Sequence, residues 1–153
     1  MISWGNIVTL SKKNFMELQQ QKISNGVNNL KAVEWILRIG VAGEFLGHGV
    51  FALQGKKQWI GWISGMTGAG ADSAATLLFL VGAMDILVAV IVLVRPIRIA
   101  LLWAAFWGFW TALVRPLVGE PVWDFIERWA NWAAPLALLF MLPRPQSLKE
   151  WFK

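Results

Sequence analysis

The sequence predicts an all-α integral membrane protein, a bundle of four transmembrane helices, from three observations. Hydrophobic residues make up 57% of the 153-residue chain and charged residues only 15%, against about 25% charged residues in an average soluble domain. Four apolar segments are each long enough to cross the roughly 30 Å of hydrocarbon in a bilayer. Tryptophans lie near the ends of these segments, as an aromatic belt requires: Trp4, Trp35, Trp59, Trp62, Trp123 and Trp151.

The predicted spans follow one another with short connections. The first span runs over Val33–Leu53, and residues 58–73 then form a glycine-rich loop in the membrane interface. The second span covers Ala74–Val94, the third Ile97–Val114 and the fourth Pro121–Leu142. The first half of the fourth span is amphipathic, so only its second half is fully compatible with lipid.

The chain divides into three predicted parts. Residues 1–31 form a polar cytoplasmic tail, residues 32–143 the four-helix transmembrane domain, and residues 144–153 a short basic cytoplasmic tail. The first tail either forms a short interfacial helix around Phe15 to Ile23 or stays flexible, and Gly26 ends any such helix.

The distribution of basic residues predicts the orientation. An excess of lysine and arginine marks the cytoplasmic side, and here ten basic residues fall on one side against four on the other. The ten are Lys12, Lys13, Lys22, Lys31, Arg38, Arg95, Arg98, Arg144, Lys149 and Lys153, and the four are Lys56, Lys57, Arg115 and Arg128. Both termini are therefore expected in the cytoplasm. The formal charge of +5 then faces anionic lipid, so the expected partner is the bilayer and not nucleic acid.

Polar residues occur in all four predicted spans, although a charge inside a bilayer is costly and such residues usually face the bundle interior. Glu44 and His48 stand four apart and so share one helix face. Glu44 and Asp85 fall near the middle of the membrane and the remaining polar residues in its outer half. We therefore predict a pocket that opens to the outer face and gathers Glu44, His48, Asp85, Arg115, Glu127, Arg128 and Asn131.

Three tryptophans inside the third span, Trp103, Trp107 and Trp110, follow helical spacing. They are either a packing stripe or, at Trp107 and Trp110, an aromatic wall of the pocket for a flat ring such as a quinone. In the fourth span, Pro135 removes the hydrogen bond to the carbonyl of Asn131 and leaves a free acceptor beside the pocket.

Two further features limit the chemistry. The chain has no cysteine, which excludes disulfides, thiol chemistry and thiolate-bound metals, and its only histidine is His48; no metal site is predicted. The intramembrane charges either line a ligand site or only neutralise one another and fix the helix order. The Gly43–Gly47 pair, with Gly40 on the same face, predicts close helix packing.

Several segments together resemble the DoxX-like membrane proteins, over residues of about 33 to 142. The first-helix run Leu37-Arg38-Ile39-Gly40, continued by Phe45-Leu46-Gly47-His48-Gly49, is similar to the first-helix signature of that family. The later segments are similar to an uncharacterised bacterial branch of it: Trp107-Gly108-Phe109-Trp110-Thr111-Ala112, Arg115-Pro116-Leu117-Val118-Gly119, Glu127-Arg128, Asn131 and Pro135.

The resemblance implies a multi-pass protein of the bacterial inner membrane. The family takes its name from a small subunit of a thiosulfate:quinone oxidoreductase, so the first hypothesis is a quinone-linked redox subunit, not an autonomous enzyme, with quinone as its ligand. It would work with a membrane partner subunit or as a homo-oligomer, because the chain carries no haem or flavin motif of its own. The alternative is a non-enzymatic membrane protein that binds or passes a small polar solute, or a structural subunit of a membrane complex.

Overall fold

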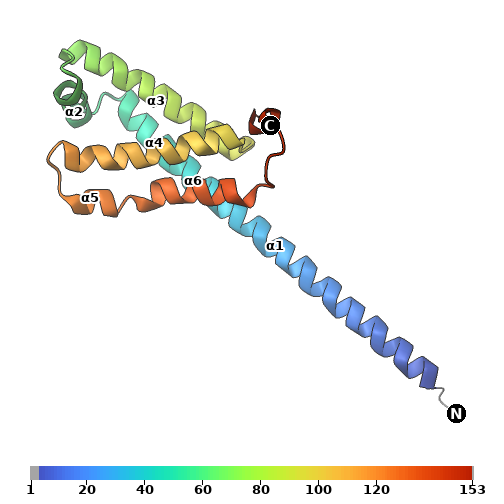
Figure 1. Ribbon diagram of the computed structural model, residues 1–153. Helices are drawn as coiled ribbons and strands as arrows, with labels where there is room; N and C mark the ends of the chain where they lie inside the picture. Colours follow the sequence, from blue (N-terminus) through green and yellow to red (C-terminus); the bar gives the residue numbers. More distant parts are fainter. Residues whose placement is uncertain (1–3, 153) are drawn as a thin grey trace. The chain divides into compact units, whose positions relative to one another are not determined.

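Helices account for all regular structure in the part of the chain that is described. A computed structural model describes the backbone of residues 4–152 and the side chains of residues 15–152. In chain order the elements are α1 (Trp4–Leu53), α2 (Lys57–Thr67), α3 (Ala71–Val94), α4 (Arg98–Leu117), α5 (Val122–Ile126), α6 (Trp129–Met141) and the 3-10 turn η1 (Leu148–Phe152) (Figure 1). The all-α prediction is confirmed over this range. The side chains of Trp4, Lys12 and Lys13, and all of Lys153, lie outside the described residues.

Among the described residues, three helices are long and apolar enough to cross a membrane: α1 over Phe15–Leu53, α3 and α4. The class of membrane protein is thus supported, but the predicted fourth span, Pro121–Leu142, is not one continuous helix. Glu127 and Arg128 separate the 5-residue α5 from the 13-residue α6, and each is too short to cross a bilayer by itself. The amphipathic first half of that segment, noted in the sequence, is where the helix breaks.

The chain divides into two compact units, with the boundary between Trp35 and Ile36. In the first unit the helix starts at Trp4, and the side chains of residues 15–33 are exposed. The prediction that Gly26 ends the helix is wrong, because α1 continues through it. One glycine costs a helix only about 1 kcal/mol relative to alanine. The asparagines beside Gly26 are weak helix formers, but the glutamines, lysines and leucines beyond them favour the helix.

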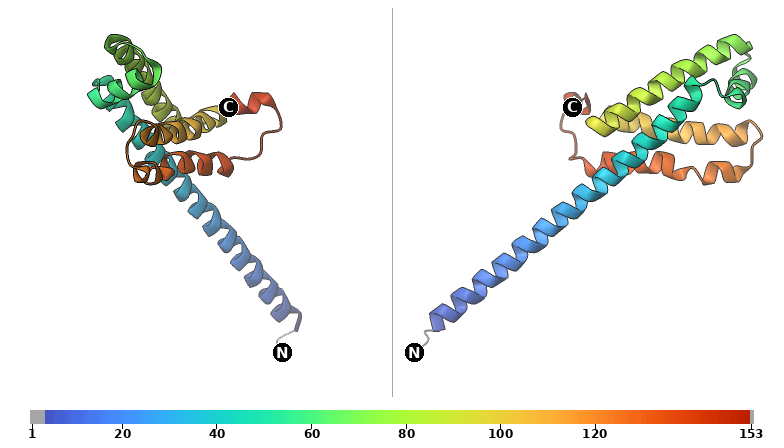
Figure 2. Two further views of the ribbon diagram at one scale, coloured as in Figure 1. Left: turned by 60° about the vertical axis from the view of Figure 1, so that its left-hand side comes forward. Right: turned by 180° about the vertical axis from the view of Figure 1, so that it is seen from behind.

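The core of the second unit combines residues from α1, α3, α4 and α6. Its buried members are Val41, Ala42, Phe45, Val88, Ala89, Val92, Leu101, Ala104 and Leu138. Helix α4 packs against α3, α5 and α6, and Figures 1 and 2 show α4 and α6 side by side with opposite chain directions. Many of these side chains are small, so the helices approach closely in this core.

Glycines mark two close approaches between helices, neither of them at the predicted pair. A Cβ added to Gly49 would lie 2.9 Å from the carbonyl oxygen of Gly82, and one added to Gly82 would lie 2.9 Å from that of Gly49. Gly43 and Gly47 have no atom within 4 Å of such a Cβ, so the predicted packing there is wrong. The buried face of α1 follows Val41, Phe45 and Gly49, and Gly47 lies on another face.

The second close approach joins α4 to α6. A Cβ on Gly108 would lie 2.6 Å from the carbonyl oxygen of Asn131. This is the carbonyl that Pro135, inside α6, leaves without its helical hydrogen bond. The freed carbonyl therefore packs against the backbone of α4 at a position where only glycine fits.

Two arginines bind main-chain carbonyls near the connection between α3 and α4. Arg38, only 8% exposed, donates from Nε to the oxygen of Val92 at 3.2 Å and from Nη2 to those of Leu93 and Val94. It thus satisfies carbonyls that the C-terminal end of α3 leaves open. Arg98 donates to the oxygens of Pro143 and Glu150, both at 2.7 Å, and so holds the C-terminal segment beside the start of α4.

Candidate functional site

A cavity of about 260 Å³ lies within the second unit, lined by residues of α1, α2, α3 and α4 together with Arg128. Seven of the nine residues predicted for the pocket line it: Glu44, His48, Asp85, Trp107, Trp110, Arg115 and Arg128. Glu127 and Asn131 are not part of the lining. The rest of the wall is mainly apolar and aromatic, and consists of Phe45, Trp59, Trp62, Ile63, Met66, Thr67, Leu78, Val81, Gly108, Thr111 and Val114.

Asp85, in the middle of α3, is the most deeply buried acidic group of the lining, with 3% of its surface exposed. The Trp107 indole of α4 lies near its carboxyl group. Even so, neither Asp85 Oδ1 nor Trp107 Nε1 makes a hydrogen bond of ordinary geometry to any described residue. A buried polar atom without a partner costs about 1–3 kcal/mol, so this pair leaves hydrogen-bonding capacity unused at the cavity wall.

Glu44 and His48 occupy the α1 side of the cavity. Their i,i+4 spacing brings His48 Nδ1 to 3.7 Å from Glu44 Oε1, as predicted for one helix face. The His48 ring lies 5.6 Å, centroid to centroid, from the ring of Trp59 on α2. Trp59 Nε1 is buried and also lacks a hydrogen-bond partner within the described part of the chain. This side of the cavity thus combines the Glu44–His48 pair with the N–H donor of Trp59, which, like that of Trp107, has no partner among the described residues.

Arg115, near the end of α4, links three elements at the edge of the cavity. Its guanidinium carbon lies 5.3 Å from the ring centroid of Trp62 on α2, within reach of a cation–π interaction. Its Nη1 lies 4.0 Å from Asp124 Oδ2 on α5. Its Nε is buried and has no partner among the described residues. Arg115 is therefore held on two sides and keeps one donor unused.

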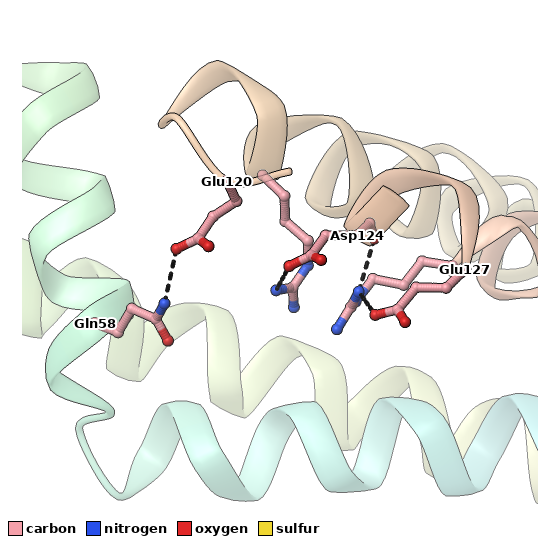
Figure 3. A network of polar contacts seen from close by, with 6 residues as sticks. Gln58, Glu120, Asp124 and Glu127 are labelled. Atoms are coloured by element: carbon pink, nitrogen blue, oxygen red, sulfur yellow. Dashed lines mark hydrogen bonds and ion pairs between the residues drawn. The ribbon is translucent and has the colours of Figure 1, made fainter. Parts of the chain in front are cut away.

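Glu127 supports the site from outside the lining. It pairs with the guanidinium of Arg128, which also donates to the main-chain oxygen of Asp124 at 2.7 Å. Nearby, Gln58 Nε2 of α2 donates to Glu120 Oε1 at 3.0 Å, which ties α2 to the connection between α4 and α5 (Figure 3). Acidic residues of the α4–α6 region thus orient the polar side chains that border the cavity.

The wall contributed by α2 was missed by the sequence analysis, which assigned residues 58–73 to a loop and Trp59 and Trp62 to the aromatic belt. Trp59, Trp62, Ile63 and Met66 follow the i, i+3, i+4, i+7 spacing of a helix with one apolar face, and this signal could have identified the helix. Trp103, in contrast, is outside the lining. It stacks on Trp107 with ring centroids 5.6 Å apart and ring planes at 12°.

Fold and site together define a helical membrane protein with an aromatic cavity among its helices. Comparisons with protein-family models, with curated proteins and with solved structures found no match. The similarity to the DoxX-like proteins therefore stays a prediction from the sequence motifs.

Proposed function

We propose that this protein is a DoxX-like protein of the bacterial inner membrane that binds a flat, carbonyl-bearing ring of the quinone class in its cavity. One observation carries the proposal. Six buried side-chain nitrogen or oxygen atoms in the described part of the chain lack a hydrogen-bond partner, and four of them belong to residues of the cavity lining.

The chemistry of these four atoms indicates the ligand. Trp59 Nε1, Trp107 Nε1 and Arg115 Nε are donors, and Asp85 Oδ1 is an acceptor when the carboxyl group is ionised. A ring carbonyl accepts hydrogen bonds from N–H groups, and a ring hydroxyl donates to a carboxylate. A purely structural charge network would pair its members and leave no space between them, so the unused donors favour a ligand site.

The apolar part of the wall favours a ring over a small polar solute. Ligand sites of membrane and soluble proteins are typically apolar with a few placed polar groups. Here Phe45, Leu78, Val81 and Val114 supply apolar surface, and Trp110 adds an aromatic face. Burial of a polar solute against these side chains would strand its polar groups.

The proposed role is that of a ligand-binding subunit and not of an autonomous oxidoreductase. Electron transfer to or from a quinone requires a second redox group. A membrane partner protein would supply those electrons, and the ring would enter or leave the cavity as a diffusible carrier.

The proposed topology has four crossings, with α5 and α6 together forming the fourth. Arg115, near one end of α4, lies 4.0 Å from Asp124 of α5, and Arg98, at the other end, binds the oxygens of Pro143 and Glu150. These contacts support an α5–α6 segment that runs the length of α4. With the basic residues counted as above, both termini would lie in the cytoplasm.

Binding of a defined quinone to the purified protein tests the function. Decylubiquinone and menadione are titrated into the detergent-solubilised protein, and tryptophan fluorescence quenching is recorded. The Trp107→Phe variant should bind about fivefold more weakly, because it loses one hydrogen-bond donor. Trp132→Phe is the matched control: Trp132 Nε1 is also buried without a described partner, but Trp132 is not in the lining, so its affinity should stay unchanged. Absence of saturable binding, or equal loss in both variants, would refute the proposal.

A further inference from the structure

A second surface of the molecule, away from the cavity, combines unpaired cations with exposed apolar side chains. We define the C-terminal basic surface as Arg95, Arg144 and Lys149 with Leu148 and Phe152. All five are exposed, Leu148 to 83% and Phe152 to 69%. None of the three cations forms an ion pair with another of the side chains described, those of residues 15–152.

Specific contacts hold this surface together. Arg98 donates to the main-chain oxygens of Pro143 and Glu150, which brings the C-terminal segment against the start of α4, three residues after Arg95. Glu150 is the acidic residue of this segment, and its Oε2 accepts the main-chain N–H of Gln146 at 2.8 Å. Figures 1 and 2 show the C-terminal turn beside the α3–α4 connection in every view.

The occupant that fits this combination is an anionic lipid. The surface lies where α3 ends and α4 begins, and both helices are long and apolar enough to cross a membrane. In a bilayer this surface would therefore lie at the level of the lipid headgroups. Arginine and lysine attract the phosphates of anionic lipid, and apolar side chains beside them enter the acyl boundary. Because its cations are unpaired and its apolar side chains exposed, the surface complements both parts of such a lipid. We propose that the C-terminal basic surface is a binding site for anionic phospholipid headgroups.

Lipid retention by the full-length protein tests this site. The detergent-purified protein is titrated with dioleoyl phosphatidylglycerol or dioleoyl phosphatidylcholine, and bound lipid is counted by native mass spectrometry. We expect tighter binding of phosphatidylglycerol. Each charge removed, in Arg144→Gln and in Lys149→Gln, should weaken it by about fivefold, with phosphatidylcholine binding unchanged.

The control removes the same charge at another exposed site. Lys57→Gln lies at the start of α2 and should leave phosphatidylglycerol binding as in the wild type. Equal loss in Lys57→Gln and Lys149→Gln would mean that only net charge matters, and equal affinity of the wild type for both lipids would mean that no headgroup is recognised. Either result overturns the proposal. Unchanged melting temperatures of the variants ensure that a loss reports on the surface and not on folding.

Discussion

Asp85 is a buried carboxyl group to which the described structure gives no ion-pair partner. The Trp107 indole and the carboxyl group of Glu44 lie near enough to influence its charge, and neither is a cation. Removing one partner of a buried ion pair leaves the other charge buried without a counterion. Removal of the Asp85 carboxylate would leave no such cation behind. The described structure therefore shows no cation that offsets the burial of Asp85, and the proposed ligand would supply a partner for it.

Replacement of Asp85 by leucine should consequently stabilise the protein while it abolishes ligand binding. We expect the free energy of unfolding to rise by about 1–3 kcal/mol, since an unpartnered buried oxygen is removed. Thermal unfolding in detergent measures this change, and quinone titration measures the loss of affinity. Asp72→Leu, at the exposed first turn of α3, serves as the control and should bind normally. A lower melting temperature for Asp85→Leu would reveal a structural partner for the carboxylate and contradict this account.

Gly108 gives a second prediction at the level of single residues. Alanine at this position would place its Cβ 2.6 Å from the carbonyl oxygen of Asn131, so α4 and α6 would have to separate. The Gly108→Ala variant should lose about 1–3 kcal/mol of stability, the usual cost of overpacking. Gly47→Ala, where nothing lies within 4 Å of the new Cβ, should be neutral or slightly stabilising. Equal melting temperatures for the two variants would argue against the close approach.

The residues of the site were predictable to the extent that helical spacing and membrane depth determine their position. The four-residue step from Glu44 to His48 and the central position of Asp85 bring these groups to the cavity. Helical spacing does not determine which way side chains point where a helix is interrupted. Glu127 was predicted in the lining as part of one continuous helix. In the structure it lies between α5 and α6, outside the lining, and pairs with the adjacent Arg128.

Among the elements, α2 is the one that we expect to move as a cover of the cavity. It has no buried residue, and glycines with positive φ stand on both sides of it, Gly55 at 69° and Gly68 at 73°. Glycine adopts such angles without strain, so both ends of α2 turn sharply. One exposed hydrogen bond, from Gln58 to Glu120, joins α2 to the α4–α5 connection. Motion of α2 would open the cavity between Trp59 and the α4 wall.

Linking α2 to the α4–α5 connection should therefore slow ligand exchange. Since the chain has no native cysteine, the variant Gln58→Cys/Glu120→Cys can be joined with a short, reducible bifunctional thiol reagent. The rates of quinone association and dissociation, followed by stopped-flow fluorescence, should fall at least tenfold and recover on reduction, by analogy with closing lids that set ligand exchange. Each single-cysteine variant treated in the same way is the control. Unchanged rates in the linked protein would mean that the ligand enters by another route.

The sequence could not show where α5 ends and α6 begins, because local signals conflict there. Pro121 suggests the start of a helix, and the apolar run after Trp129 suggests its continuation. At the turn, Arg128 has φ −97° and ψ 12°, and its guanidinium contacts the adjacent Glu127 side chain and the main-chain oxygen of Asp124 four residues earlier. No pattern of hydrophobic residues encodes these local polar contacts. The uniformly apolar span was predicted more accurately: it was expected to start at Ala74, and α3 starts at Ala71.

At the level of the whole molecule, topology is the property to test. If α5 and α6 form a fourth crossing, cysteines at Lys57 and Lys149 lie on opposite sides of the membrane. In intact cells an impermeant maleimide should label Lys57→Cys and leave Lys149→Cys unlabelled until the membrane is permeabilised, as the excess of basic residues on the inner side requires. Labelling of both in intact cells would indicate three crossings.

The contacts of Arg38 and Arg98 have a consequence for the evolution of this protein. Both guanidinium groups bind main-chain oxygens, on Val92, Leu93 and Val94 in one case and on Pro143 and Glu150 in the other. Every amino acid carries a main-chain carbonyl oxygen, so substitutions at the residues that accept these hydrogen bonds can leave the bonds intact. Across homologues we would expect arginine at both positions without covariation at the residues whose main-chain oxygens it binds. Substitution statistics alone would then miss these contacts at the helix ends.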